Sequence, residues 1–303
     1  MESITKKPLS RLVIMVAATF LTANAFAGTA TPISSCDTVI TAPGKYFLST
    51  DLSCSGTTGV MIAASKVDLD LRGHTIDGGN DLKGIGISTT SKDISSSGDE
   101  SFCLGVTNIV IHDGTVTGYS VPGGIGILLC SPNPVGGPAV AMSVTVQRMV
   151  LKGNETGLVL VASGQNKITN NFVSKGSIGI ALANGCSNNQ ISNNLLDGNT
   201  DQFGGGAGIV IKGPSNTVTG NVAINSDFGI NITQVAVNTK IINNTTSHNA
   251  IGIEAEAASA GNVFKGNTSF SNTNFDLEDD NDNCTSNTWT SDFFGTSSLA
   301  CIQ

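Results

Sequence analysis

Four carboxylates near the C-terminal end of the chain have a spacing that could place them on one surface. Glu254 and Glu256 are separated by one residue, and Glu278 and Asp280 repeat this spacing 24 residues later. Alternate residues of a β-strand point to the same face of a sheet, so each pair projects together if its segment is a strand. Two carboxylates about 5 to 9 Å apart can serve as acid, base or nucleophile in glycoside hydrolysis. We call these four residues the acidic ledge, and its three glutamates are catalytic candidates.

Three further polar residues fall on the same predicted surface. Lys212 is its only basic residue and is the fourth catalytic candidate. Asn231 and Thr233 stand 23 residues before Glu254 and Glu256. Because an amide and a hydroxyl can both donate and accept hydrogen bonds, these two residues are candidates for substrate binding.

The segment from Asp276 to Asp282 offers oxygen ligands of the kind that Ca²⁺ prefers. Asp276, Glu278 and Asp280 are the candidate ligands, which makes Ca²⁺ a possible cofactor. The segment lacks the spacing of a complete calcium loop, with its central glycine and terminal glutamate. A solvated acidic surface is therefore the alternative interpretation. The chain has no cysteine and histidine cluster with the spacing of zinc ligands.

Repeats in the sequence predict the elements that would hold these residues in register. Seven times a glycine stands directly before an aliphatic residue that opens a strand-like run, as in Gly208-Ile209 and Gly252-Ile253. An Asn-x-(Ile/Val/Phe)-x-x-Asn motif, with one variant, alternates with these runs, and its final asparagines are 23, 27, 23 and 23 residues apart. Such a period is typical of a solenoid, in which each coil buries its apolar face by stacking on its neighbours.

Stacked coils place equivalent residues in ladders along the solenoid axis, about 4.8 Å apart. We expect two inward apolar ladders, formed by Ile180, Ile209, Ile230 and Ile253 and by Ile178, Ala207, Phe228, Ile251 and Phe275. The glycine column is expected to face outward, followed by the ladder Val159, Ala181, Val210, Asn231, Glu254 and Glu278 and by the ladder Val161, Ala183, Lys212, Thr233, Glu256 and Asp280. Turn positions, where asparagine tolerates the left-handed conformation, are expected to hold Asn171, Asn194, Asn221, Asn244 and Asn267.

The chain divides into four predicted segments. Residues 1–27 carry three basic residues, an apolar run and a small-residue cleavage site after Ala27, which predict a secretory signal. A membrane anchor is the alternative, but the apolar run is shorter than the roughly 20 residues that a span requires, and no later segment could span a bilayer. Residues 28–66 are predicted to form an N-terminal cap, residues 67–275 the coils and residues 276–303 a C-terminal cap. We therefore expect a secreted or periplasmic protein.

The net charge of the chain indicates which partners to expect, and its cysteines indicate which disulfides to expect. Removing residues 1–27 takes away three basic residues and one glutamate, so the net charge of −8 becomes −10. An acidic surface disfavours nucleic acid, which needs clustered lysine and arginine, and repels a polyanionic sugar unless a cation or a basic patch intervenes. We therefore expect a monomer whose partner is a polysaccharide.

The cysteines of an exported protein are expected to form disulfides. We predict the pairs Cys36–Cys54, Cys103–Cys130 and Cys284–Cys301, which leave Cys186 unpaired.

The end of the chain has two interpretations. Trp289, with Phe293 and Phe294, could stack on a sugar ring, or it could cover the last coil, since terminal repeats must block edge pairing and exposure of the core. The cap is the favoured interpretation.

Three insertions break the period at about residues 90–106, 130–141 and 199–206. Inserted loops of solenoids either shape the binding surface or are passive surface loops.

Several motifs carry a resemblance to a known superfamily. They are the Gly-Ile-x-Leu and Asn-x-Ile-x-x-Asn coils, the opening run from Val67 to Gly78, and the ending from Asp280 through Trp289 to Ile302. Nearly all of the chain after residue 27 resembles secreted right-handed parallel β-helix proteins of the pectate-lyase-like superfamily. The resemblance implies an all-β, right-handed parallel β-helix of about eight or nine coils with disulfide-stapled caps.

The resemblance leaves the activity open, because fold does not fix function. The superfamily includes polysaccharide lyases, glycoside hydrolases, epimerases, adhesins and copper-enzyme accessory proteins of the NosD type. A lyase would use a basic residue such as Lys212, and a copper site lacks a ligand set because the chain has no histidine cluster and few methionines.

Our leading hypothesis is binding or processing of extracellular or cell-envelope carbohydrate. The alternatives are a lyase or hydrolase that uses the acidic ledge, and a structural surface protein or adhesin. A deep groove beside the ledge would favour the enzyme, and a flat glycine-lined face would favour binding or adhesion.

Overall fold

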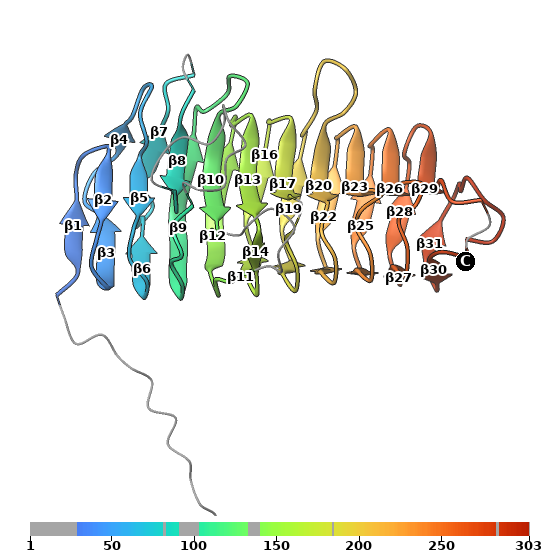
Figure 1. Ribbon diagram of the computed structural model, residues 1–303. Coiled ribbons are helices and arrows are strands. Elements are labelled where there is room, and N and C mark those ends of the chain that lie inside the picture. Colours follow the sequence, from blue (N-terminus) through green and yellow to red (C-terminus); the bar gives the residue numbers. More distant parts are fainter. Residues whose placement is uncertain are drawn as a thin grey trace, which may run out of the picture.

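The chain folds into a right-handed parallel β-helix (Figure 1). The computed structural model describes residues 29–80, 83–90, 103–132, 140–183, 185–282 and 285–302. Within these ranges all regular elements are β-strands, arranged in one sheet of 19 strands, one of ten and one of two. The predicted signal, and most of the insertions expected at residues 90–106 and 130–141, lie outside the described residues.

Sheet B, the sheet of ten strands, takes one strand from each coil, and successive strands pair in parallel. The first two of these strands come from residues 28–66, which explains why the stack is longer than the eight or nine coils predicted. The strands, in spatial order, are β2 (Thr38–Ile40), β5 (Val60–Ile62), β8 (Ile85–Ser88), β10 (Ile125–Cys130), β13 (Thr156–Val161), β17 (Ile178–Leu182), β20 (Ala207–Ile211), β23 (Phe228–Ile232), β26 (Ile251–Ala255) and β29 (Phe275–Asp279).

Sheet A, the sheet of 19 strands, contains the other strands of each coil, which in the C-terminal half run as two parallel ladders. Its strands are β1 (Thr31–Ile33), β3 (Gly44–Leu48), β4 (Leu52–Ser53), β6 (Val67–Asp70), β7 (Thr75–Asp77), β9 (Ile109–Thr117), β12 (Thr145–Lys152), β15 (Lys167–Thr169), β16 (Phe172–Ser174), β18 (Gln190–Ser192), β19 (Leu195–Asp197), β21 (Thr217–Thr219), β22 (Val222–Ile224), β24 (Lys240–Ile242), β25 (Thr245–Ser247), β27 (Val263–Lys265), β28 (Thr268–Phe270), β30 (Thr288–Thr290) and β31 (Phe293–Phe294). Strands β11 (Val140–Ala141) and β14 (Ser163–Gly164) form the two-stranded sheet.

The core lies between the sheets and is built from stacked aliphatic side chains. The isoleucine ladder predicted to face inward does so, and its members Ile180, Ile209, Ile230 and Ile253 are fully buried. Each of these isoleucines pairs with its equivalent in the next coil. Burial of apolar surface stabilises the fold by roughly 25 cal/mol per Å², so each added coil gains stability from its contacts with its neighbours.

The glycine column faces inward, which corrects the expectation that it lines the outer surface. A Cβ atom on Gly208 would lie 2.6 Å from the carbonyl oxygen of Gly229 in the next coil and 3.0 Å from the Cβ of Ala223 in sheet A. Glycine and the isoleucine after it therefore both point inward, and the alternation of the strand is interrupted. The preceding residue is consequently turned outward, so Ile178 and Phe228 are half-buried on the surface instead of in the predicted second core ladder.

Asparagine ladders run through the turns of the coils, as predicted. The ladder residues Asn171, Asn194, Asn221, Asn244 and Asn267 are buried. The backbone N–H and the side-chain amide of each donate to the Oδ1 of the next asparagine at 2.9 to 3.0 Å. At the end of the ladder, Asp292 accepts the same two hydrogen bonds from Asn267. The left-handed residue is the one before the ladder position, as at Asn193, so the ladder asparagines satisfy buried backbone groups rather than supply a positive φ.

Two of the three predicted disulfides form within the described residues. Cys36 and Cys54 form the predicted disulfide in the first coils, and Cys103 and Cys130 form the second one. Cys301 is also disulfide-bonded, whereas Cys284, its predicted partner, lies outside the described residues.

Trp289 covers the last coil, as the favoured interpretation predicted. It is 5% exposed, stacks on Phe264 with ring centroids 3.7 Å apart, and donates its indole N–H to Asp279 at 2.8 Å. Phe293 of the same terminal segment remains 68% exposed. The buried indole closes the core and is not available as a stacking platform.

Candidate functional site

The outward ladder of sheet B brings the predicted site residues together. Val210 on β20, Asn231 on β23, Glu254 on β26 and Glu278 on β29 are paired residues of successive parallel strands. Adjacent strands are about 4.8 Å apart, so these side chains form a continuous row. The prediction of this ladder is confirmed.

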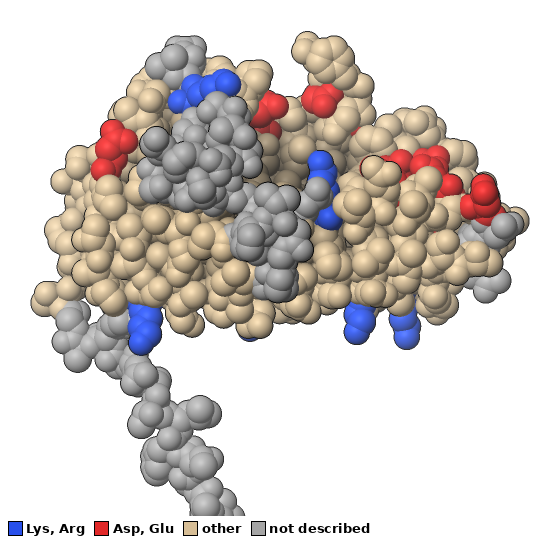
Figure 2. All heavy atoms as spheres, viewed as in Figure 1, with Lys and Arg blue, Asp and Glu red and all other residues tan. Residues whose placement is uncertain are grey.

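A groove of about 800 Å³ lies along this row and crosses the coils from β17 to β29. We call it the ledge groove. Six of the predicted candidates line it, namely Lys212, Asn231, Thr233, Glu254, Glu256 and Asp280, whereas Glu278 is not among its lining residues. Apolar and neutral residues complete the lining, namely Ile178, Gly205, Ala207, Val210, Phe228, Gln234, Val235 and Ala257. In Figure 2, acidic side chains gather over the C-terminal coils of this face.

Asn231 connects the two glutamates of β26 and its following turn. Its side-chain amide donates to Oε2 of Glu254 and, at 3.2 Å, to Oε1 of Glu256. The backbone N–H of Gln234 donates to the other oxygen of Glu256 at 3.1 Å. Asn231 is 7% exposed, yet its Oδ1 has no hydrogen-bond partner among the described residues. The groove therefore contains a buried acceptor that a ligand could satisfy.

Burial and mutual repulsion raise the pKa values of three ledge carboxyls. Burial, followed by the charges of Asp280, Glu256 and Glu278, raises the pKa of Glu254 to about 7. The pKa of Glu278 is raised by burial and by Asp280, and that of Asp280 by burial and by its acidic neighbours. A carboxyl with a pKa near 7 can donate or accept a proton at neutral pH, which general acid–base catalysis requires.

The two other polar candidates lie on the N-terminal side of the ledge. Thr233 is 8% exposed, and its hydroxyl donates a hydrogen bond to the carbonyl of Ile211 at 3.2 Å. Lys212 is exposed, and the ion pairs found among the described residues do not include it. Its ammonium group is therefore available to a ligand in the groove.

The predicted calcium ligands are not brought together. Asp276 occupies the inward position that glycine holds in earlier coils and is 3% exposed. Its Oδ1 accepts hydrogen bonds from the backbone and side chain of Asn272, and its Oδ2 accepts from the N–H groups of Gly295 and Thr296. These hydrogen bonds tie the C-terminal segment to the last coil. Asp276 is thus a structural residue, on the opposite side of the strand from Glu278.

The insertion predicted at about residues 199–206 forms a loop beside the ledge groove, although no residue of it was named as a site candidate. Residues 199–206, between β19 and β20, project beyond the turns of the neighbouring coils (Figure 1). Asp201 braces this loop, because it accepts from the N–H groups of Phe203 at 2.6 Å and Gly205 at 3.1 Å. Phe203 is 88% exposed, while Gly205 lines the groove. The insertion that breaks the repeat was the available signal.

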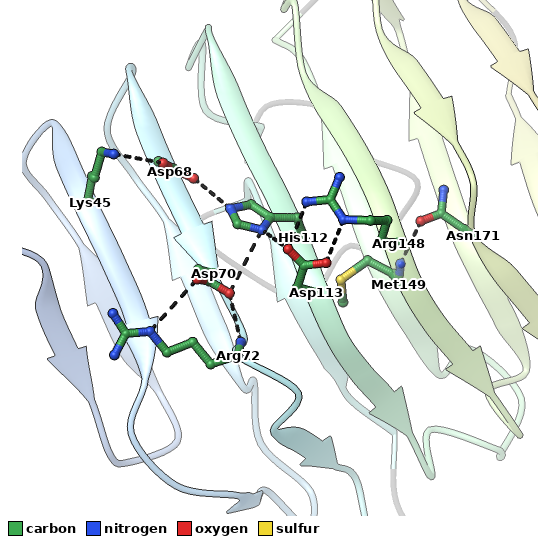
Figure 3. A network of polar contacts seen from close by, with 9 residues as sticks. All are labelled: Lys45, Asp68, Asp70, Arg72, His112, Asp113, Arg148, Met149 and Asn171. Atoms are coloured by element: carbon green, nitrogen blue, oxygen red, sulfur yellow. Dashed lines mark hydrogen bonds and ion pairs between the residues drawn. The ribbon is translucent and has the colours of Figure 1, made fainter. Parts of the chain in front are cut away.

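A second charged cluster lies on the outer face of sheet A near the N-terminal end (Figure 3). His112 on β9 places Nε2 2.9 Å from Asp68 and Nδ1 2.6 Å from Asp113, and Arg148 binds both oxygens of Asp113 at 2.6 and 2.7 Å. Burial lowers the pKa of His112, but the hydrogen bonds to Asp113 and Asp68 outweigh it and raise the pKa. In the structure β6 pairs with β9 so that Asp70 lies opposite His112, a register that the insertion between the two coils hides in the sequence.

One free thiol is found among the described residues. Cys186 is unpaired, as predicted, and is fully buried. Burial raises its pKa to about 11, so the nucleophilic thiolate is scarce at neutral pH.

The fold and these features define a right-handed parallel β-helix protein of the pectate-lyase-like type. Residues 136–297, more than half of the chain, match the sequence profile of a family described as "Periplasmic copper-binding protein (NosD)". The chain therefore belongs to this family. No curated protein matches the chain in sequence.

Solved structures similar to this chain include an epimerase module and a tailspike protein. The A-module of the mannuronan C-5 epimerase AlgE6 from Azotobacter vinelandii is 14% identical, with a TM-score of 0.51 over 82% of this chain and 69% of that module. The tailspike protein gp208 of Dettilon is 15% identical, with a TM-score of 0.49 over 88% of this chain and 61% of the tailspike. The chain thus spans less than two thirds of the tailspike. At these identities the likeness concerns the fold alone.

The family description names copper, and the described residues do not fit a copper site. Among them, the one group of three potential ligands within reach of each other is Asp70, His112 and Asp113. It supplies a single imidazole, and both ring nitrogens already face carboxylates. Copper prefers several imidazoles, thiolates or thioethers, whereas Met142 and Met149 are buried in the core.

In the described part of the chain, we find no helix that is long and apolar enough to cross a membrane.

Proposed function

We propose that the protein binds a polysaccharide along the ledge groove and acts outside the cytoplasm. The observation that carries this proposal is the groove itself, in which consecutive coils present amide, hydroxyl and carboxylate groups beside apolar side chains. Sugars offer both hydroxyl groups and apolar ring faces, so this mixture suits them. The groove crosses four interstrand steps, or about 19 Å, which is the length of a short oligosaccharide rather than a monosaccharide.

Two further observations support a location outside the cytoplasm. The family to which the chain belongs is described as periplasmic, and disulfides are typical of exported proteins. A groove, and not a flat glycine-lined face, lies beside the acidic ledge. By the criterion given in the sequence analysis this favours an enzyme, which must first bind its polysaccharide. The adhesin alternative predicted a glycine-lined outer surface, and the glycine column does not form one.

Phe203 is the residue on which we test polysaccharide binding. An exposed aromatic ring on a braced loop can stack on a sugar ring with little loss of conformational freedom. Replacing Phe203 with alanine is expected to weaken binding of the retained polysaccharide about tenfold, from the usual size of an aromatic contact. Affinity electrophoresis against a panel of neutral, amino-sugar and uronic-acid polysaccharides measures this change.

The matched control is Phe293→Ala, which removes an exposed aromatic residue from β31 on sheet A. It should leave both the retention and the melting temperature unchanged. If the wild-type protein is retained by none of the polysaccharides, the proposed function is wrong.

Glycoside hydrolysis is a second candidate function, favoured by the pair Glu254 and Glu278. These residues are partners on adjacent parallel strands, about 4.8 Å apart in the backbone, and retaining glycosidases place two carboxyl groups about 5 Å apart. With its pKa near 7, Glu254 suits the acid–base role, and Glu278 would be the nucleophile.

The test of hydrolysis is the release of new reducing ends from any polymer that the protein retains. Product is expected from the wild-type protein and not from Glu254→Gln or Glu278→Gln. Retention without product would leave binding as the function, and absorbance from unsaturated ends would instead indicate a lyase that uses Lys212.

A further inference from the structure

The charges of the ledge groove are unbalanced. Four carboxylates from two neighbouring coils gather at one end of the groove, where Glu254, Glu256 and Asp280 line it and Glu278 lies beside Glu254 on the next strand. Lys212 is three coils away from Glu278 and Asp280. None of the ion pairs found in the described residues involves a ledge carboxylate. Like charges this close repel one another, so a positively charged group would be attracted here.

Two hydrogen-bond acceptors at the ledge also have no donor. Oδ1 of Asn231 and Oε2 of Glu278 are buried and have no hydrogen-bond partner among the described residues. The Asn231 side chain is more than nine-tenths buried and lines the groove. A buried acceptor without a partner destabilises the protein, so a ligand that donates N–H groups would relieve this penalty.

We propose that the ligand of the ledge groove is a polymer of amino sugars whose free ammonium groups bind at the acidic ledge. This inference rests on the proposed function and specifies the class of polysaccharide. An ammonium group brings one positive charge and three N–H donors, which match the excess of carboxylates and the two unsatisfied acceptors. A uronic acid would add a negative charge to the same surface and is excluded by repulsion.

The protonation of the ledge supports the same conclusion. The pKa values of Glu254, Glu278 and Asp280 are raised, in part by their mutual repulsion. A bound ammonium group stabilises the ionised carboxylates and lowers these pKa values. Binding near pH 7 should therefore release protons, chiefly from Glu254.

Isothermal titration calorimetry with three oligosaccharides of equal length tests the proposal. The probes are a glucosamine oligomer with free amines, its fully N-acetylated counterpart and an oligouronate. The free-amine oligomer is expected to bind about tenfold more tightly than the acetylated one, given the size of a charge interaction near a protein surface. Titration in buffers of different ionisation enthalpy should show the release of protons.

Matched variants locate the preference on the ledge. Asp280→Asn, which removes a carboxylate that lines the groove, should remove most of the difference between the free-amine and acetylated oligomers. Asp282→Asn, which removes the same charge from an exposed residue that does not line the groove, should preserve it.

The outcomes separate this inference from the proposed function. Equal affinity for the free-amine and acetylated oligomers, or tighter binding of the oligouronate, overturns the inference and leaves polysaccharide binding intact. Absence of binding for all three oligomers, together with no retention on the polysaccharide panel, overturns both.

Discussion

Replacing Asn194 with alanine is expected to lower the free energy of unfolding by about 4 kcal/mol, from the usual cost of unsatisfied buried groups. The Asn194 side chain accepts from the backbone and side-chain N–H groups of Asn171 and donates to Ile168 and Asn221. It is 1% exposed, so water cannot replace these hydrogen bonds. The change leaves the backbone N–H of Asn171 without a partner and removes one donor from the carbonyl of Ile168.

Chemical denaturation of the purified protein measures this loss, and the melting temperature should fall by roughly 10 °C. Asn274→Ala is the matched control, because it removes an exposed asparagine outside the ladder and should change stability by less than about 0.5 kcal/mol. Equal stability of the two variants would show that other groups can form hydrogen bonds to the buried backbone groups of the turn when Asn194 is removed.

The end of this ladder explains why asparagine is needed within it. An asparagine both accepts from the previous coil and donates to the next, whereas Asp292 at the last step only accepts, from Asn267. An ionised carboxylate has no donor, so aspartate can end the ladder but cannot continue it. Asn194→Asp should therefore destabilise the protein as well, although its shape is nearly unchanged.

Much of the fold and of the candidate site could be predicted because the chain repeats. A period of 23 to 27 residues determines which residues stack, so Asn231, Glu254 and Glu278 could be placed in one outward row. Alternation within strands then separated inward from outward positions. These two rules were sufficient for the groove residues and for the asparagine ladder.

Sequence reasoning failed where the alternation is interrupted. At Gly208-Ile209 both residues point inward, because only a residue without Cβ fits beneath the carbonyl group of the next coil. Counting by twos from the isoleucine therefore assigned the glycine to the surface and the residue before it to the core. The same miscount placed Asp276 on the surface as a metal ligand, although its carboxylate is inside and bonded to the C-terminal segment.

Features outside the repeat had no template in the sequence. The loop that carries Phe203 is an insertion, so no equivalent residue in another coil indicates its direction. His112 and Asp68 are 44 residues apart, and an insertion separates their coils, which hides their register. The period predicts contacts between regular coils and is silent about the segments that interrupt it.

The acidic ledge is expected to make the protein less stable as the pH rises. Folding raises the pKa of Glu254 from its ordinary value of 4.5 to about 7, so the folded protein retains a proton that the unfolded chain has lost in this range. The stabilising contribution is complete below pH 4.5 and is lost as the pH rises to about 7. The loss is on the order of 2 kcal/mol.

Glu254→Gln isolates this effect, because glutamine keeps the shape of the side chain and carries no charge at any pH. At pH 8 the variant is expected to be about 2 kcal/mol more stable than the wild-type protein, and its melting temperature about 5 °C higher. At pH 4.5 the two proteins should melt together. Glu155→Gln, outside the ledge, is the control and should show no such divergence.

Parallel melting curves for Glu254→Gln and the wild-type protein across this range would show that Glu254 ionises without penalty. A gain in stability at pH 8, accompanied by loss of ligand binding, would instead mark the ledge as a surface kept for its ligand at the expense of the fold.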